Sequence, residues 1–111
     1  MMNRLPSGDH AILDIRKIED YCLNSAHPRG RHKARVFRES LGLNRGDASW
    51  LSAQLLEAAR SSEAVQLGAD GWGTQRIDVR IRRQNKAAVV RTVWIVRTGE
   101  PMPRFVTCWV L

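Results

Sequence analysis

The stretch His27-Pro28-Arg29-Gly30-Arg31-His32-Lys33-Ala34-Arg35-Val36-Phe37-Arg38 holds the densest set of side chains that could do chemistry. His32 can exchange a proton near neutral pH, and Lys33 can neutralise an anion. RNA can be cleaved without a metal ion because its own 2′-hydroxyl is the nucleophile, so a protein need supply only a base, an acid and cations. His32 and Lys33 are therefore candidate catalytic residues. On spacing alone, a helix-surface histidine without a role is the simpler interpretation of His32.

A phosphate held by such a pair would need further contacts from the strands of the second half of the chain. Arg97 and Thr107 are the strand residues that we select for this purpose, as a cation and a hydroxyl. Each also has a structural interpretation, as a surface arginine and as a β-forming residue packed on a strand face.

The charge of the chain points to an anionic partner. The formal net charge is +7, and residues 71–111 carry eight basic and two acidic side chains, whereas residues 1–70 carry ten and nine. Fifteen of the eighteen cations are arginine, which favours bidentate phosphate binding, although an arginine-biased genome would give the same count. The candidate RNA-binding residues are Arg31, Arg35, Arg76, Arg80, Arg82 and, for stacking on a base, Trp72.

The sequence lacks the motifs typical of metal binding, of nucleotide binding and of hydrolase nucleophiles. His10, His27 and His32 do not have the spacing of a zinc site, and Cys22 and Cys108 belong to no CxxC motif, so we expect no metal and no cofactor. We interpret the two cysteines as buried apolar residues, and a disulfide between them stays open. Phosphate-binding loops, dinucleotide-binding glycines and hydrolase nucleophile motifs are absent from the sequence.

Periodicity predicts three helices in the first half. Asp14 caps a helix over 15–23, Gly30 and Gly42 bound a helix over 31–41, and Asp47 caps a helix that ends near Ser62. The third of these repeats apolar residues at three and four positions, and includes Trp50.

The second half predicts strands. A short strand over 64–67 precedes a glycine-rich loop, and residues 76–82 alternate so that Ile77, Val79 and Ile81 face inward and the arginines outward. A turn at 84–86 leads to strands over 87–96 and 104–111, apolar on both faces, in which Trp94 and Trp109 are expected in the core. The predicted fold class is α+β, with three N-terminal helices packed on a four-stranded antiparallel sheet whose other face is free to bind.

Length and hydropathy predict a single domain over 1–111, made of an arm over 1–10, a helical half over 11–62 and a sheet half over 63–111. No apolar run reaches the length of a membrane span, so we expect no membrane association. The expected location is a bacterial cytoplasm, or the cytoplasm of a target cell if the domain is the tip of a delivered toxin.

Three segments carry a resemblance to a known family: Leu5-Pro6, the run from His27 to Phe37, and the closing Trp94-Ile95-Val96-Arg97…Pro103-Arg104-Phe105-Val106-Thr107-Cys108. They resemble a family of small bacterial domains of unknown function, found in loci like toxin–antitoxin pairs and at the C-termini of polymorphic toxins. That family is similar to the barnase, EndoU, colicin and RelE-like ribonucleases, which implies helices on a four-stranded sheet and catalysis by His32, Lys33, Arg97 and Thr107. Trp109 stands where members often have tyrosine, so a hydroxyl of the family is missing here.

The resulting hypothesis is a metal-independent endoribonuclease of toxin type, held in check by a small acidic antitoxin or immunity protein. The alternative is a non-catalytic RNA- or protein-binding module that uses the same arginines for phosphate contacts only.

Overall fold

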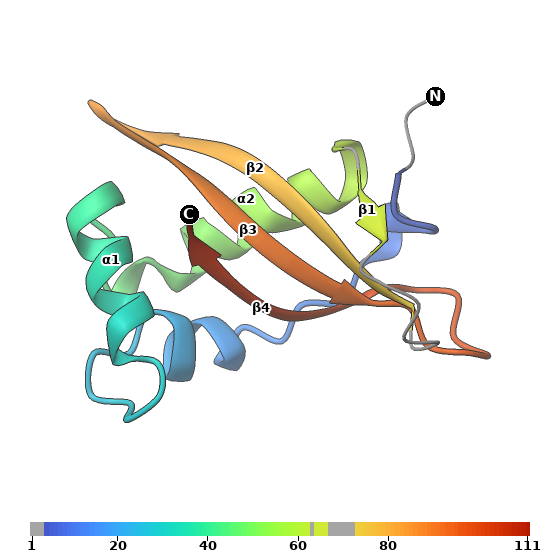
Figure 1. Cartoon of the computed structure of the whole chain (residues 1–111), viewed down its shortest axis with the longest axis horizontal. Coiled ribbons are helices and arrows are strands. Elements are labelled where there is room, and N and C mark those ends of the chain that lie inside the picture. The colour runs from blue at the N-terminus through green and yellow to red at the C-terminus, as the bar shows by residue number, and fades with distance from the viewer. Residues whose placement is uncertain (1–3, 63, 67–72) are drawn as a thin grey trace.

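A computed structural model describes residues 4–62, 64–66 and 73–111, and shows an antiparallel sheet with helical segments on one face and at one end (Figure 1). The short helical segments are η1 (Gly8–His10), η2 (Ile18–Cys22) and η3 (Arg45–Asp47), and the α-helices are α1 (Arg31–Leu41) and α2 (Ala48–Ser61). The strands are β1 (Val65–Gln66), β2 (Thr74–Arg83), β3 (Lys86–Ile95) and β4 (Arg104–Val110), adjacent in that order.

The predicted layout of three helices on four strands is wrong. The segment expected to form a helix over 15–23 is helical over 16–22, but most of it is the π-helical turn η2, closed by a hydrogen bond from Leu23 N to Ile18 O. This wider turn buries Ile18, Cys22 and Leu23 together, and the branched Ile15 and Ile18 do not favour a longer α-helix. The sheet has three long strands, and β1 adds only two residues beside β2. The architecture implied by the resemblance to the barnase-like ribonucleases is therefore corrected to two α-helices on a sheet of three long strands.

Several other predicted elements are confirmed. Helix α1 begins and ends at the predicted residues, and Gly42 terminates it with a positive φ of 68° that suits glycine. The two-residue turn Gln84–Asn85 joins β2 to β3, with Arg83 paired to Lys86. Ile77 and Ile81 are buried on the inner face of β2, whereas Arg80 and Arg82 are exposed.

The core lies between the inner sheet face and α2, which Figure 1 shows behind the sheet. Trp94 and Phe105 meet edge to face there, with ring centroids 5.4 Å apart. The buried Thr92 is satisfied, since its Oγ1 donates to Ile77 O and accepts from Trp94 Nε1, both at 2.8 Å. Leu5, in the expected N-terminal arm, is also buried in this core.

Strand β4 contains a β-bulge that decides which of its side chains leave the core. Phe105 pairs with Trp94 but Thr107 pairs with Val93, so Val106 is an extra residue on β4. Strict alternation would place Phe105, Thr107 and Trp109 on one face. Because of the bulge, Phe105 and Cys108 are both buried instead, and Thr107 and Trp109 turn to the outer side. The prediction that Trp109 is a core residue is wrong for this reason.

Candidate functional site

The turn before α1 fixes where that helix begins. The Nδ1 atom of His27 accepts hydrogen bonds from the backbone N–H groups of Arg29 and Gly30, both at 3.0 Å. A Cβ on Gly30 would lie 2.2 Å from the carbonyl oxygen of Tyr21, so only glycine lets the turn pack this closely on η2. The His27 ring also meets the Tyr21 ring edge to face at 4.8 Å. His27 and Gly30 therefore serve to place the first turn of α1 against Tyr21.

Lys33 is the centre of the candidate site. Its Nζ donates a hydrogen bond to Thr107 Oγ1 at 3.1 Å, which joins α1 to β4 across a large sequence separation. The same ammonium lies 4.9 Å from the ring centroid of Tyr21 and 5.2 Å from that of Trp109. A lysine held between two aromatic faces and one hydroxyl has a fixed position, while its half-buried side chain still reaches the surface.

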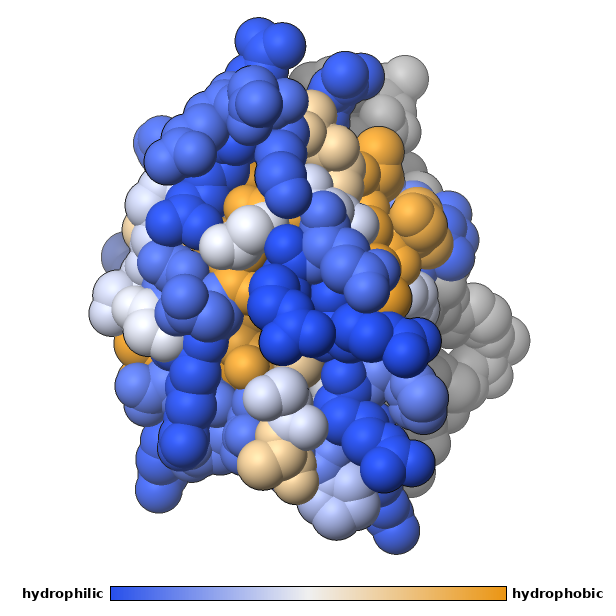
Figure 2. Space-filling view, turned by 90° about the vertical axis from the view of Figure 1, so that its left-hand side faces the viewer, coloured by the Kyte–Doolittle hydropathy of each residue, from blue (hydrophilic) through white to orange (hydrophobic). Residues whose placement is uncertain are grey.

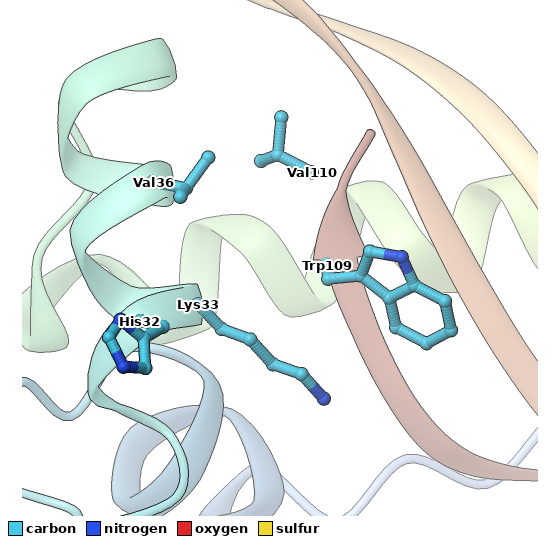
Figure 3. A pocket seen from close by; sticks show the side chains of 5 residues that line it. All are labelled: His32, Lys33, Val36, Trp109 and Val110. Atoms are coloured by element: carbon cyan, nitrogen blue, oxygen red, sulfur yellow. The ribbon is translucent and has the colours of Figure 1, made fainter.

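Two hollows adjoin at Lys33. One has a volume of about 410 Å³ and is lined by His32, Lys33, Val36, Trp109 and Val110 (Figure 3). The other has a volume of about 310 Å³ and is lined by Lys17, Tyr21, Lys33, Val106 and Thr107. Together they form a groove along the outer edge of β4, which we call the β4 groove.

The β4 groove lies beside a hydrophilic surface. Figure 2 looks onto the side of the molecule that carries α1, and shows mostly hydrophilic residues with apolar residues exposed between them. Lys17 is at the rim of the groove and donates to the carbonyl of Phe105 at 2.8 Å.

The residues predicted for catalysis are only partly brought together. Lys33 and Thr107 are in direct contact. His32 is exposed and lines the same hollow as Lys33, but in Figure 3 its side chain stays on the helix side and does not extend toward β4. Arg97 is exposed in the loop after β3, two positions beyond Ile95. Thr107 pairs with Val93, so at about 3.3 Å per residue Arg97 lies roughly 13 Å farther along the strand direction, outside the Lys33 cluster.

The residues predicted for RNA binding occupy two surfaces. Arg31 and Arg35 are exposed on α1, and Arg80 and Arg82 are exposed on the outer face of β2. Arg76 is half-buried on the same face and lies 3.8 Å from Asp78. Trp72 lies outside the described residues.

Asp78 and Arg91 form a bidentate ion pair on the outer sheet face, with both hydrogen bonds at 2.9 Å. The hydrogen bond from Arg91 lowers the pKa of Asp78 below its ordinary value. Asp78 is the only acidic residue in β2, β3 and β4. Asp78 therefore pairs with Arg91 and also lies close to Arg76, so one carboxylate partly neutralises two arginines of this face.

Sequence reasoning missed Tyr21, Lys17 and Cys22 as neighbours of the site. Tyr21 and Lys17 are four residues apart, which is the only sequence signal that they share a face. Cys22 lies beneath Thr107, with its Sγ 3.9 Å from Thr107 Oγ1 and 3.7 Å from the carbonyl of Cys108. Both cysteines are buried free thiols, as predicted for their burial.

The two thiols differ in acidity. A hydrogen bond from Cys108 is the main cause that lowers the pKa of Cys22 to about 6, with smaller contributions from Thr107 and the nearby Lys33 charge. The pKa of Cys108 is raised well above its ordinary value, first because it donates to Cys22 and then because of burial. Cys22 is thus the thiol of the pair that loses its proton first.

The parts of the chain that the structure describes also bear on metal binding and on membrane spans. There, no three side chains of His, Cys, Asp or Glu gather closely enough to hold a metal ion together. Within the same ranges, no helix is both long enough and apolar enough to cross a membrane.

These features define a small α+β domain with a cationic groove along the edge strand of its sheet. The chain belongs to the family described as a domain of unknown function (DUF6883), whose model matches residues 4–111. No curated protein and no solved structure matches the chain.

Proposed function

We propose that the domain is a metal-independent endoribonuclease that holds the scissile phosphate at Lys33 in the β4 groove. The observation that carries the proposal is the position of Lys33, whose ammonium is fixed by Thr107 between Tyr21 and Trp109. Attack of the 2′-hydroxyl on the adjacent phosphorus expels the 5′-oxygen of the next nucleotide and leaves a 2′,3′-cyclic phosphate. Such a reaction needs proton transfer and charge stabilisation and no metal ion.

Each side chain has a role that its chemistry supports. The Lys33 ammonium stabilises the extra negative charge of the phosphorane, and Thr107 holds Lys33 in place while offering a hydroxyl to a phosphate oxygen. His32 on the rim and Tyr21 inside the groove are the groups available for proton transfer. The tyrosine expected at position 109 from the family resemblance is replaced by Trp109, and Tyr21 brings a phenol to the opposite side of Lys33.

Exposed arginines of α1 and of the outer face of β2 are proposed to contact neighbouring phosphates of the RNA chain. Arg31 and Arg35 lie on α1, and Arg80 and Arg82 lie on the outer face of β2. Arg97, which lies farther along the sheet, is proposed only for a flanking phosphate.

Cleavage of RNA in EDTA by matched lysine variants tests the proposal. We expect Lys33→Met to slow cleavage about 100-fold or more, because the phosphorane loses its fixed cation. Lys86→Met is the control, since Lys86 also donates one hydrogen bond, to Glu39 O at 3.2 Å, but lies at the β2–β3 turn. Equal rates for the two variants, or intact RNA with the unaltered protein, would contradict the proposal.

Two further variants separate the proton-transfer roles. We expect the variant that lacks the general base, either His32→Ala or Tyr21→Phe, to cleave RNA about 100-fold or more slowly. His32 is exposed, so its replacement should leave the thermal unfolding temperature unchanged.

The second candidate function is a non-catalytic RNA-binding module. It is favoured by the position of His32, whose side chain stays on the helix side and does not extend toward β4 (Figure 3). Salt-sensitive RNA binding that survives His32→Ala, with no cleavage at any pH, would establish this function instead.

The proposed protein partner is a small acidic antitoxin or immunity protein. Its support is the net charge of +7 and the two lysines that line the groove, Lys17 and Lys33, which an acidic surface would complement. Co-expression with the product of a neighbouring gene should relieve a growth defect caused by the domain. A growth defect that no neighbouring gene product relieves would count against this partner.

A further inference from the structure

The larger hollow of the β4 groove has apolar walls on the surface of a strongly basic domain. Val36 of α1 faces Val110 and Trp109 of β4 across about 410 Å³, and all three side chains are partly exposed (Figure 3). Trp109 does not belong to the buried core, because the bulge at Val106 turns it outward. An open apolar site of this size suits a small ligand with a flat apolar face.

Lys33 belongs to both hollows and therefore links an anion site to this apolar site. Its Nζ contacts Thr107 in the smaller hollow, and lies 5.2 Å from the ring centroid of Trp109 in the larger one. An anion on the Lys33 ammonium would thus lie next to the tryptophan wall. A nucleotide carries an anionic phosphate and a flat base on the same ribose, which matches the juxtaposition.

We propose that the larger hollow is a base-binding subsite that takes one unpaired nucleobase of single-stranded RNA. The base packs against Trp109, Val36 and Val110 while its own phosphate lies at Lys33. A base in a duplex is paired and stacked and cannot enter, so the substrate class is single-stranded RNA or an unpaired loop. This inference rests on the proposed function for its choice of RNA, and its binding site can be tested apart from cleavage.

Binding of short 2′-fluoro oligonucleotides, which lack the attacking hydroxyl, tests the subsite without any reaction. The comparison is between a single strand with bases and a strand of the same length whose sugars are abasic. Because stacking of a base on an aromatic side chain favours binding, we expect the abasic strand to bind about 5- to 100-fold more weakly. We expect Trp109→Ala to lose most of this preference for the strand with bases, and Trp109→Phe to retain most of it.

Trp50→Ala is the matched aromatic control, since Trp50 lies on α2 beside Arg83 at 5.4 Å, in a different part of the domain. Val36→Gln changes the helical wall of the hollow and should lower the same ratio, and serves if Trp109→Ala does not fold. If the ratio of the two strands' affinities is unchanged in both groove variants, or falls equally in Trp50→Ala, the base-binding subsite is overturned.

The outcomes also separate the subsite from the nuclease. Base-dependent binding through Trp109 together with intact native RNA would support the subsite and contradict the proposed cleavage. Cleavage of native RNA with no dependence of binding on bases or on Trp109 would support the nuclease and overturn the subsite.

Discussion

Lys33 gains part of its position from residues that themselves do no chemistry. The bulge at Val106 turns Thr107 toward it, and the turn at Gly30 sets the first helical turn on Tyr21. A lysine on an exposed helix would otherwise sample many rotamers at an entropic cost on binding. At the scale of single residues, the candidate site is therefore built on an ammonium group whose position is fixed before a ligand binds.

Gly30→Ala tests the packing of α1 on η2. The added Cβ would meet the Tyr21 carbonyl at 2.2 Å, so we expect a loss of about 1–3 kcal/mol in the free energy of unfolding and weaker RNA binding. Gly42→Ala, which meets no atom within 4 Å but has a positive φ of 68°, should cost about 1 kcal/mol without affecting binding. Denaturant titrations measure both, and an equal effect on RNA binding would contradict the role given to Gly30.

Cys22 gives the stability of the domain a defined pH dependence. Its pKa is lowered from the ordinary 9.0 to about 6 in the folded chain, so the unfolded chain binds more protons between these values. The contribution of this thiol to the free energy of unfolding is fully present above pH 9.0 and is lost as the pH falls through about 6. We expect the advantage of the unaltered protein over Cys22→Ser to grow from pH 6 to pH 9.0, as measured by denaturant unfolding. An advantage that does not change with pH would show that the thiol stays protonated.

At the scale of the element, β4 supplies the site because its regular alternation is interrupted. The extra Val106 lets Phe105 and Cys108 both enter the core, and it releases Thr107 and Trp109 to the groove. β-Bulges commonly re-aim side chains next to functional sites. Strand β2, in contrast, alternates regularly and presents Arg80 and Arg82 on the outer face.

Asp78→Asn tests the outer sheet face as an RNA surface. The substitution removes the only carboxylate of the long strands and frees Arg91 from its bidentate pair, so we expect tighter RNA binding. The slope of log affinity against log salt should steepen by about 0.7 for one added phosphate contact to a single strand. Because the pKa of Asp78 is lowered, the pair stays intact at neutral pH, and the gain requires the substitution.

Glu57→Gln is the control for this experiment. It also removes a carboxylate paired with an arginine, Arg60 at 2.8 Å, but lies on α2 away from the outer face of the sheet. If both variants gain RNA affinity equally, the gain comes from the change in net charge, and the outer sheet face is not a specific RNA-binding surface.

At the scale of the whole molecule, sequence patterns located the elements better than their arrangement. Gly30 and Gly42 predicted the ends of α1, and regular alternation predicted which residues of β2 face inward and outward, because both patterns are local. The π-helical turn and the bulge were not predicted, because each inserts one extra residue into a regular helical or strand repeat. Tertiary packing, which the local sequence pattern does not contain, determines where this happens. His32 and Lys33 were recognisable by type, whereas the closeness of Lys33 and Thr107 depends on a contact between distant segments.

The most direct test of the central claim is incubation of one RNA in EDTA as its native and 2′-fluoro forms, with analysis of the product ends. We expect the native strand to be cleaved with a 2′,3′-cyclic phosphate, and Lys33→Met to leave it intact over the same time. The 2′-fluoro strand should bind and remain whole, because its nucleophile is missing. Intact native RNA, or cleavage of both strands alike, would contradict cleavage by the 2′-hydroxyl at Lys33.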